Sequence, residues 1–432
     1  MRARVGRGEA LVIPANRADL SSRERWRLLK DRLFAAVMAV GGISVIVAIL
    51  LIFFYLLYVV LPLFRDATVK PTASFEQGAA AAIALDEYAQ TGFSIAPDGH
   101  YQFFKAGDGS VIAGGELLPA GAGKVSAVAA GDPVSHVYVA GTGDGNVGIA
   151  QVSFEVKFEG QTRVVTPKLG YPFGEQVQRA TPAGDAIRLI TGQASDEEAT
   201  IAVVSAQGKV VLINATRQTS MLDESVSVEV TRTELDVDGS KISQLALDNQ
   251  QRELYLAGSD GVLSYFDVRN KAKPQLVDRA SVIGDAHHIT AMSFLSGGIS
   301  LVIGDDLGNL TQWFPVRDQH NNSQLKRVRR FAPLPAGVTA IAPEYFRKGF
   351  LAVDAKGNLG LYHATAERHL TTVASGLDEV AALSMAPRAN AAVLASKSGK
   401  VALFAIDNPH PEVSFKALWN QIWYENRAHP DY

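Results

Sequence analysis

The sequence of 432 residues contains no cysteine. This absence excludes disulfide bonds, thiolate metal sites and cysteine nucleophiles. The chain also has no excess of basic residues, because its net charge is −3. Nucleic-acid-binding proteins are typically basic. We therefore expect no nucleic-acid partner. Hydrophobic residues make up 47% of the chain and charged residues 20%, which are ordinary values for a folded core.

Charge is absent from one long stretch near the N-terminus, residues 33–64. This run exceeds the roughly 20 apolar residues that cross a bilayer. A backbone in lipid must satisfy its own hydrogen bonds, so we predict a transmembrane helix over 33–64, ending near Pro62. The residues that we assign to this membrane anchor are Leu33, Phe34, Val47, Leu51, Phe54, Tyr55 and Tyr58.

The preceding segment, residues 1–32, is basic, with nine Lys or Arg against four acidic residues, a net charge of +5. Basic residues concentrate on the cytoplasmic side of membrane helices. We therefore expect a cytoplasmic tail at 1–32 and export of the rest of the chain. The alternative is a cleaved signal peptide, whose apolar core would be only about 7–15 residues long. The length of the run favours a retained anchor.

The exported part repeats one pattern seven times: an apolar strand, a loop, a second strand, a turn centred on glycine, and a third strand. Glycine accepts the positive φ of tight hairpins without strain. Repeats of this kind at intervals of roughly 40–60 residues predict an all-β, WD40-like β-propeller over residues 65–410, with seven blades. Six or eight blades, or a pair of β-sandwiches, are the alternatives. The turn glycines are Gly109, Gly145, Gly208, Gly261, Gly308, Gly357 and Gly399.

Each blade also needs a fourth, outer strand, and the segments between the repeats are more polar, as strands at a rim should be. Ala82–Leu85 could then complete the last blade and close the ring, which removes open edges. Residues 152–169 are predicted to form an elongated hairpin, which explains the long interval before Gly208. The candidate outer strands are residues 231–237, 275–282, 324–332 and 368–375.

Two short motifs resemble phosphate-binding loops. Residues 143–148 match GxGxxG, but a dinucleotide site requires this pattern between a strand and a helix, and here it joins two strands. Residues 120–124 resemble a phosphate loop, yet Leu118 occupies the position of its first glycine. We therefore predict neither a cofactor site nor a catalytic site.

Three polar clusters also favour structural interpretations. Adjacent strand residues point to opposite faces, so His287 and His288 do not easily share a metal ion. Asp305 and Asp306 lack the spacing of a calcium loop and are predicted to form a turn. The basic run 326–330 is expected to be a solvated outer strand protected against edge pairing. A surface for an anionic partner or for lipid headgroups is the alternative.

The C-terminal segment, residues 411–432, has apolar residues at the spacing of one helix face. Tryptophans on such a face suit a membrane interface or a partner helix. The other interpretation is a helix packed against the propeller. The candidate interface residues are Phe415, Leu418, Trp419, Ile422 and Trp423.

The basic stretch 23–34, the single anchor, the propeller-like repeats and the tail 410–432 together resemble a known family. This arrangement is similar to the N-terminal part of the long PstC-type permease of bacterial phosphate ABC transporters. The resemblance implies a bacterial inner-membrane protein whose bulk is periplasmic. It also implies other permease and ATPase subunits and a periplasmic phosphate-binding protein as partners.

The resemblance has one departure, because no stretch after Phe64 is apolar and long enough to span a membrane. The transport core is therefore absent from this sequence, and no permease residue can be transferred to it. The leading hypothesis is a non-catalytic, membrane-anchored module of a phosphate importer. The alternatives are a stand-alone propeller scaffold for another envelope complex, and an enzyme that uses the propeller channel, for which no convergent polar set is found.

Overall fold

A computed structural model describes residues 22–61, 65–159, 162–219, 226–283, 287–345 and 348–407. The chain divides into two compact units, residues 1–64 and 65–432. The described part of the first unit is helical, and the described part of the second consists of β-strands with one short 3-10 helix, η2 (Gly239–Lys241). We describe the two units separately.

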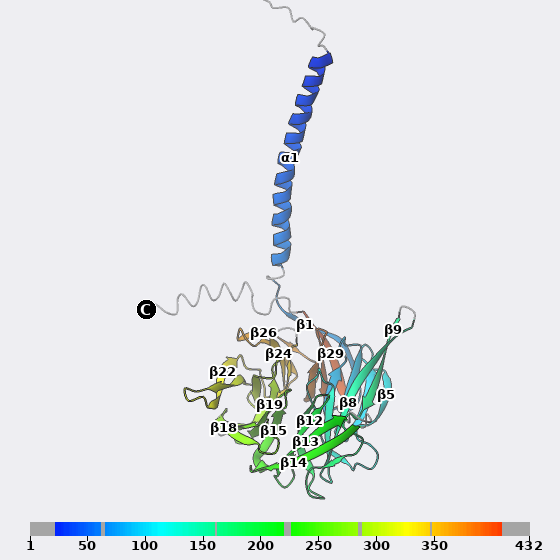
Figure 1. Ribbon diagram of the computed structural model, residues 1–432, viewed down its shortest axis with the longest axis vertical. Coiled ribbons are helices and arrows are strands. Elements are labelled where there is room, and N and C mark those ends of the chain that lie inside the picture. The colour runs from blue at the N-terminus through cyan, green and yellow to red at the C-terminus, as the bar shows by residue number, and fades with distance from the viewer. Residues whose placement is uncertain are drawn as a thin grey trace, which may run out of the picture. The chain divides into compact units, whose positions relative to one another are not determined.

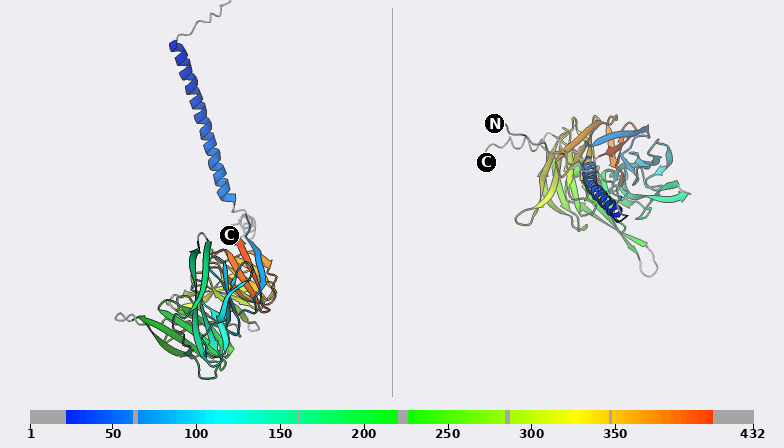
Figure 2. Two further views of the ribbon diagram at one scale, coloured as in Figure 1. Left: turned by 90° about the vertical axis from the view of Figure 1, so that its right-hand side faces the viewer. Right: turned by 90° about the horizontal axis from the view of Figure 1, so that it is seen from above.

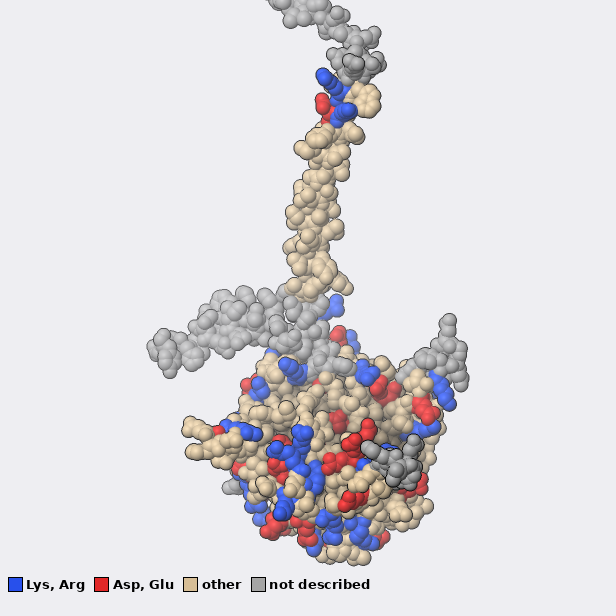
Figure 3. Space-filling model, in the orientation of Figure 1, with Lys and Arg blue, Asp and Glu red and all other residues tan. Residues whose placement is uncertain are grey.

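Helix α1 (Ser22–Val60) has 39 residues and is, among the described residues, the one helix long and apolar enough to cross a membrane. At 1.5 Å per residue it is about 58 Å long, against about 30 Å for the hydrocarbon core of a bilayer. Its charged residues all lie between Arg23 and Arg32, at the N-terminal end (Figure 3). The helix begins at Ser22, before the predicted membrane segment 33–64, because the basic stretch is rich in Arg, Leu, Lys and Glu, which favour helix.

The second unit contains seven antiparallel sheets, each of which is one blade of a β-propeller (Figure 1). We name the strands of a blade a, b, c and d from the central channel outward. Blade 1 consists of β2 (Ala82–Leu85), β3 (Thr91–Ile95), β4 (His100–Lys105) and β5 (Val111–Glu116), in the order a to d. Blade 2 consists of β6 (Val125–Ala130), β7 (Val137–Thr142), β8 (Asn146–Glu159) and β10 (Gln178–Arg179). Blade 3 consists of β11 (Ile187–Ala194), β12 (Glu198–Ser205), β13 (Val210–Thr219) and β14 (Val226–Leu235).

The remaining four blades have the same strand order. Strands a to d of blades 4, 5, 6 and 7 are β15 (Ile242–Leu247), β16 (Glu253–Gly258), β17 (Val262–Asp267) and β18 (Gln275–Ser281); β19 (Ile289–Phe294), β20 (Leu301–Asp305), β21 (Leu310–Arg317) and β22 (Ser323–Phe331); β23 (Val338–Pro343), β24 (Gly349–Asp354), β25 (Asn358–His363) and β26 (Arg368–Ala374); β27 (Val380–Met385), β28 (Ala391–Ser396), β29 (Lys400–Asp407) and β1 (Thr68–Glu76). The predicted outer strands correspond to β14, β18, β22 and β26.

The ring closes through β1, which pairs with β29 from Thr68 opposite Asp407 to Glu76 opposite Lys400 (Figure 2). The first and last strands of the propeller thus share blade 7, and the inner strand β27 contacts β2 of blade 1. The prediction that Ala82–Leu85 closes the ring is wrong, because this segment is β2 and pairs with β3. Its four residues are all buried, as an inner strand requires.

The b–c turns share one backbone geometry. A glycine at positive φ forms each turn, and its carbonyl accepts a hydrogen bond of 2.8–2.9 Å from an amide that follows the outer strand. In blade 1 this glycine is Gly99, whose carbonyl accepts from Leu117, whereas Gly109 lies between β4 and β5. The predicted repeat was therefore displaced by one strand in blade 1. The seven glycines are Gly99, Gly145, Gly208, Gly261, Gly308, Gly357 and Gly399.

A side-chain oxygen three residues before the glycine caps five of these turns. It accepts a hydrogen bond of 2.8–3.1 Å from the amide of the residue after the glycine, as Asp305 does from Asn309. The prediction that Asp305 forms a turn is confirmed. The capping residues are Thr142, Ser205, Asp305, Asp354 and Ser396.

Strand β8 extends beyond its blade and pairs with β9 (Thr162–Gly170), from Gln151 opposite Gly170 to Glu159 opposite Thr162. The predicted elongated hairpin is therefore confirmed, and the ribbon projects from the blade (Figure 1). Apolar clusters fill the spaces between neighbouring blades. One of them, for example, joins Val139 of β7 to Ile201 of β12 and Ile213 of β13.

Candidate binding site at the channel mouth

A hollow of about 580 Å³ opens where the inner strands of the propeller end. All seven blades contribute to its lining, with residues at the ends of the a strands and in the a–b loops. We call this side of the propeller the mouth face. The c strands run back to this face, so Asp407 and its partner Thr68 also lie on it. The chain therefore enters and leaves the described propeller at the mouth face.

The floor of the hollow is apolar. Five blades each contribute one aliphatic or thioether side chain to it, and these side chains surround the channel. The buried Ile83 comes from β2, and the others are partly buried. A pocket with an apolar lining and a few fixed polar groups is the usual form of a binding site. The floor residues are Ile83, Leu245, Met292, Ile341 and Leu383.

A chain of hydrogen bonds fixes the rim on the side of blades 2 to 4. The Gln193 side-chain oxygen accepts from the Asp132 amide at 2.9 Å, and its nitrogen donates to the Leu247 carbonyl at 3.2 Å. Asn249 of blade 4 donates to the Asp132 carboxylate at 3.5 Å. Of the described residues that line the hollow, Asp132 is the one with an ionisable acid or base charge at neutral pH. The rim therefore presents a single negative charge.

Blade 5 contributes the loop after β19 to the same rim. Gly298 lies at φ +71°, and a Cβ atom there would be 2.3 Å from Oδ1 of Asn249. Glycine accepts this positive φ without strain and leaves room for the Asn249 side chain. A second hollow, of about 520 Å³, continues from this loop between blades 5 and 6, beside the exposed Ile299.

Tyr345 lines both hollows. Burial raises the pKa of its phenol, and the Asp132 carboxylate adds to this effect, so the hydroxyl is neutral at physiological pH. Its buried oxygen has no hydrogen-bond partner among the described residues. Buried hydroxyl groups nearly always have a partner, so this hydroxyl is an exception within the described part of the chain.

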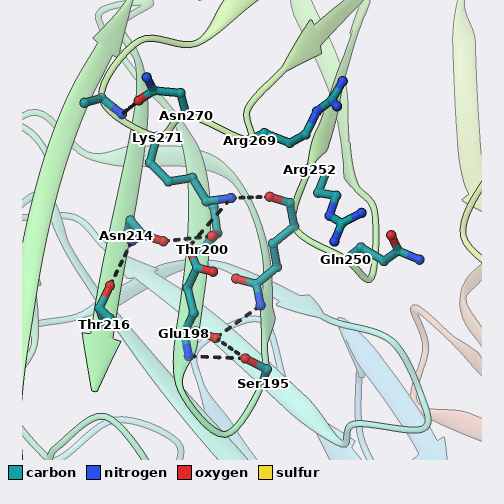
Figure 4. Close-up of polar contacts among 12 residues, drawn as sticks. Ser195, Glu198, Thr200, Asn214, Thr216, Gln250, Arg252, Arg269, Asn270 and Lys271 are labelled. Atoms are coloured by element: carbon teal, nitrogen blue, oxygen red, sulfur yellow. Dashed lines mark hydrogen bonds and ion pairs between the residues drawn. The ribbon is translucent and has the colours of Figure 1, made fainter. Parts of the chain in front are cut away.

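The seam between blades 3 and 4 adjoins the mouth and is held by polar contacts (Figure 4). Gln251, in the a–b loop of blade 4, donates its side-chain amide to the Glu198 carbonyl at 3.1 Å. Lys271 donates to the Gln251 carbonyl and lies 3.8 Å from the Glu198 carboxylate. Burial lowers the pKa of Lys271, and the nearby carboxylates of Glu198 and Asp248 oppose the shift. These contacts join the a–b loops of blades 3 and 4 and the c–d connection of blade 4.

The opposite end of the channel is built differently. The inner strands of blades 2 to 7 have a register shift one residue after their start. In four blades, the residue at the shift is Ser or Thr, and its hydroxyl donates at 3.3 Å to a carbonyl of the b strand. These hydroxyl groups already have protein partners, so they offer less to a ligand than the mouth does. The residues are Ser126, Ser243, Thr290 and Thr339.

The structure does not bring the sequence-predicted site residues together. The anchor residues are exposed along α1, and six of the seven predicted turn glycines lie on the face opposite the mouth. The C-terminal candidates from Phe415 to Trp423 lie outside the described residues. The mouth residues were missed because they come from seven separate blades and none of them forms a recognisable motif. One signal in the sequence could have identified them: polar residues occur just after the first strand of a blade, as Asp132 and Asn249 do.

The remaining motifs occupy structural positions. Residues 143–148 lie at the turn from β7 to β8, between two strands as predicted. His287 is 3.4 Å from the Asp306 carboxylate, and His288 contacts the Ser259 carbonyl at 2.6 Å. The basic run lies on the outer strand β22, with Lys326, Arg327 and Arg330 exposed. Within the described residues, no group of three or more His, Asp or Glu side chains could hold a metal ion.

Comparison with known proteins supports the fold. No family model matches the sequence, and no curated protein matches it. Among solved structures, the chain is similar to the crystal structure of the Cps50 (Swd1) β-propeller domain of Myceliophteria thermophila, with a TM-score of 0.53 and 10% identity. The match covers 79% of this chain and 100% of that domain. The protein is therefore a seven-bladed, WD40-like β-propeller with one N-terminal apolar helix.

Proposed function

We propose that the protein is a non-catalytic binding platform, held on a membrane by α1, whose channel mouth receives a partner polypeptide. The observation that carries the proposal is the hollow that all seven blades line, with its apolar floor and fixed polar rim. WD40-like propellers typically act as scaffolds, although fold alone does not establish function. The length and composition of α1 support a retained anchor, with a signal sequence as the alternative.

The chemistry of the mouth suits a polypeptide with apolar side chains next to a cationic one. The floor residues would cover the apolar side chains, and the Asp132 carboxylate would attract the positive charge. Such a complementary charge guides association and fixes orientation more than it adds affinity.

The experiment is site-specific photocrosslinking in host membranes. A photoreactive amino acid replaces Val134, which lines the mouth and is 59% exposed. The proposal expects one dominant crosslinked partner, and Asp132→Lys should abolish this product. Asp98→Lys is the matched control: both carboxylates accept the amide of the second residue after them, but Asp98 belongs to a b–c turn on the opposite face. Equal crosslinking by both variants would refute the mouth as the binding site.

We further propose that the platform serves a phosphate importer. This finer assignment rests on the resemblance of residues 23–34 and 410–432 to the long phosphate permease, and the comparisons neither support nor oppose it. In this proposal the Val134 crosslink contains a transporter subunit or the phosphate-binding protein, and deletion of the propeller reduces phosphate uptake or changes its regulation. A crosslinked partner unrelated to transport, with unchanged uptake, would instead indicate a scaffold for another envelope complex.

The membrane anchor has its own test. Alkaline carbonate extraction should leave the full-length chain in the membrane pellet, and an antibody against the N-terminal tail should detect the same product as one against the propeller. Release of the propeller without the tail would identify α1 as a cleaved signal sequence.

A further inference from the structure

The outer strand of blade 1 differs from the other outer strands of the propeller. Strand β5 pairs with β4 on one side, and its other edge has no partner strand among the described residues. Val111 and Ile112 on this strand are 59% and 41% exposed. From Val111 to Gly115 the strand reads VIAGG and has neither charge nor proline. Exposed apolar edges of this kind favour pairing with another strand.

The other long outer strands carry protective residues. Strand β22 has four basic side chains, β14 has Glu229, Arg232 and Glu234, and β1 has Lys70 and Pro71. Charged residues and proline are the usual devices that stop the edges of sheets from associating. Strand β5 has a bulge, which every long outer strand except β14 shares, and one charged residue, Glu116, at its C-terminal end.

We propose that β5 is a self-association edge, at which two copies of this chain pair in antiparallel register. A symmetric pair centred on Ala113 places each Ala113 beside its copy. It also places Ile112 opposite Gly114 and Val111 opposite Gly115, so that each branched side chain meets a glycine. No like charges face one another in this arrangement. The same operation on β22 would bring Lys and Arg side chains together, which is destabilising.

The expected strength of this contact depends on the proposed membrane anchor. A ladder of five residue pairs is about 17 Å long and buries less than the roughly 1,200 Å² of a stable soluble interface. Confinement of both copies to one membrane raises their effective concentration, which compensates for a small interface. The self-association is therefore a property of the full chain in membranes.

Disulfide crosslinking tests the register directly, because the natural chain has no cysteine. Directly opposed residues in antiparallel strands have Cα atoms about 4.5–5.5 Å apart, within the range of a disulfide. Full-length Ala113→Cys in membranes, oxidised with copper phenanthroline, should give a reducible dimer. Thr372→Cys is the control, since it places one exposed cysteine on the outer strand β26. Equal or weaker crosslinking by Ala113→Cys than by this control would overturn the proposal.

A charge substitution distinguishes pairing through β5 from pairing through α1. In the Ala113→Cys background, Ile112→Lys should reduce the dimer at least tenfold, because it places a charge at the edge. The matched control is Val328→Lys: Val328 is the bulge residue of β22, as Ile112 is of β5, and the two side chains are 42% and 41% exposed. A dimer that survives Ile112→Lys would exclude β5 as its interface. Neither result depends on the partner proposed for the channel mouth.

Discussion

Two glycines of blade 6 allow the contribution of the b–c turn contact to the stability of the propeller to be measured. Gly357 forms the b–c turn at φ +75°, and Gly376 follows the outer strand at φ +72°. A Cβ atom on Gly357 would lie 2.0 Å from the Leu377 carbonyl oxygen, whereas a Cβ atom on Gly376 would meet nothing within 4 Å. Substitution with alanine therefore imposes the same backbone strain at both positions, but a steric clash only at Gly357.

The magnitudes follow from these two terms. Alanine in the left-handed region costs about 1–2 kcal/mol, which is the whole effect expected for Gly376→Ala. At Gly357 the carbonyl of Leu377 must also move by more than 1 Å. This shift adds overpacking strain of about 1–3 kcal/mol and weakens the 2.8 Å hydrogen bond from the Ser375 amide to the Gly357 carbonyl. We expect Gly357→Ala to cost about 3–5 kcal/mol.

Equilibrium urea denaturation of the purified full-length chain, followed by tryptophan fluorescence, measures both variants under the same conditions. The two substitutions should leave the denaturant slope unchanged, because they do not alter the surface exposed on unfolding. A difference of less than about 0.5 kcal/mol between them would refute the reasoning. It would mean that the contact between the turn and the segment after β26 is not rigid.

Three further predictions concern closure, titration and the unsatisfied hydroxyl. Val69→Ala in β1 should destabilise the propeller by about 2 kcal/mol in urea denaturation, because Val69 is buried in the closing blade, whereas Lys70→Ala on the same strand should be nearly neutral. Burial raises the pKa of the Glu253 carboxyl, so the folded state binds this proton more tightly than the unfolded state does, and the wild type loses stability as pH rises and Glu253 ionises. Glutamine does not titrate, so the stability of Glu253→Gln relative to wild type should decrease as pH falls from 7.5 to 4.5. A stability difference that stays constant over this pH range would contradict the raised pKa. Tyr345→Phe should change stability by less than about 1 kcal/mol, because its hydroxyl has no partner among the described residues; a larger loss would show that the hydroxyl is bound in the folded protein.

The sequence predicts the propeller well because glycine is required at each b–c turn. Six of the seven predicted turn glycines form such a turn. The errors fall where this signal is absent. Strand β2 is four buried residues without a distinctive turn, and β1 contains Lys70 and Pro71, which are uncommon in strands. Which distant strands complete one sheet is a long-range property, and local pattern does not encode it.

The candidate site was not predictable in the same way. Successive floor side chains of the mouth are separated by about 40 to 160 residues along the chain, and ring closure alone brings them together. Asp132 is notable only in the folded protein, because the other residues that line the hollow around it are neutral. The edge strand β5 is different, because the run VIAGG is visible in the sequence, but its position at an open edge is not.

The construction of the blades also determines where recognition can be encoded. Each b–c turn is fixed by a glycine at positive φ and by its hydrogen bond to the segment after the outer strand, so substitutions there are strained. The a–b loops and the c–d hairpins lack this shared constraint and differ in length, as the extension of β8 and β9 illustrates. Both kinds of connection lie on the mouth face. A specific partner is therefore expected to bind the face at which the chain enters and leaves the propeller.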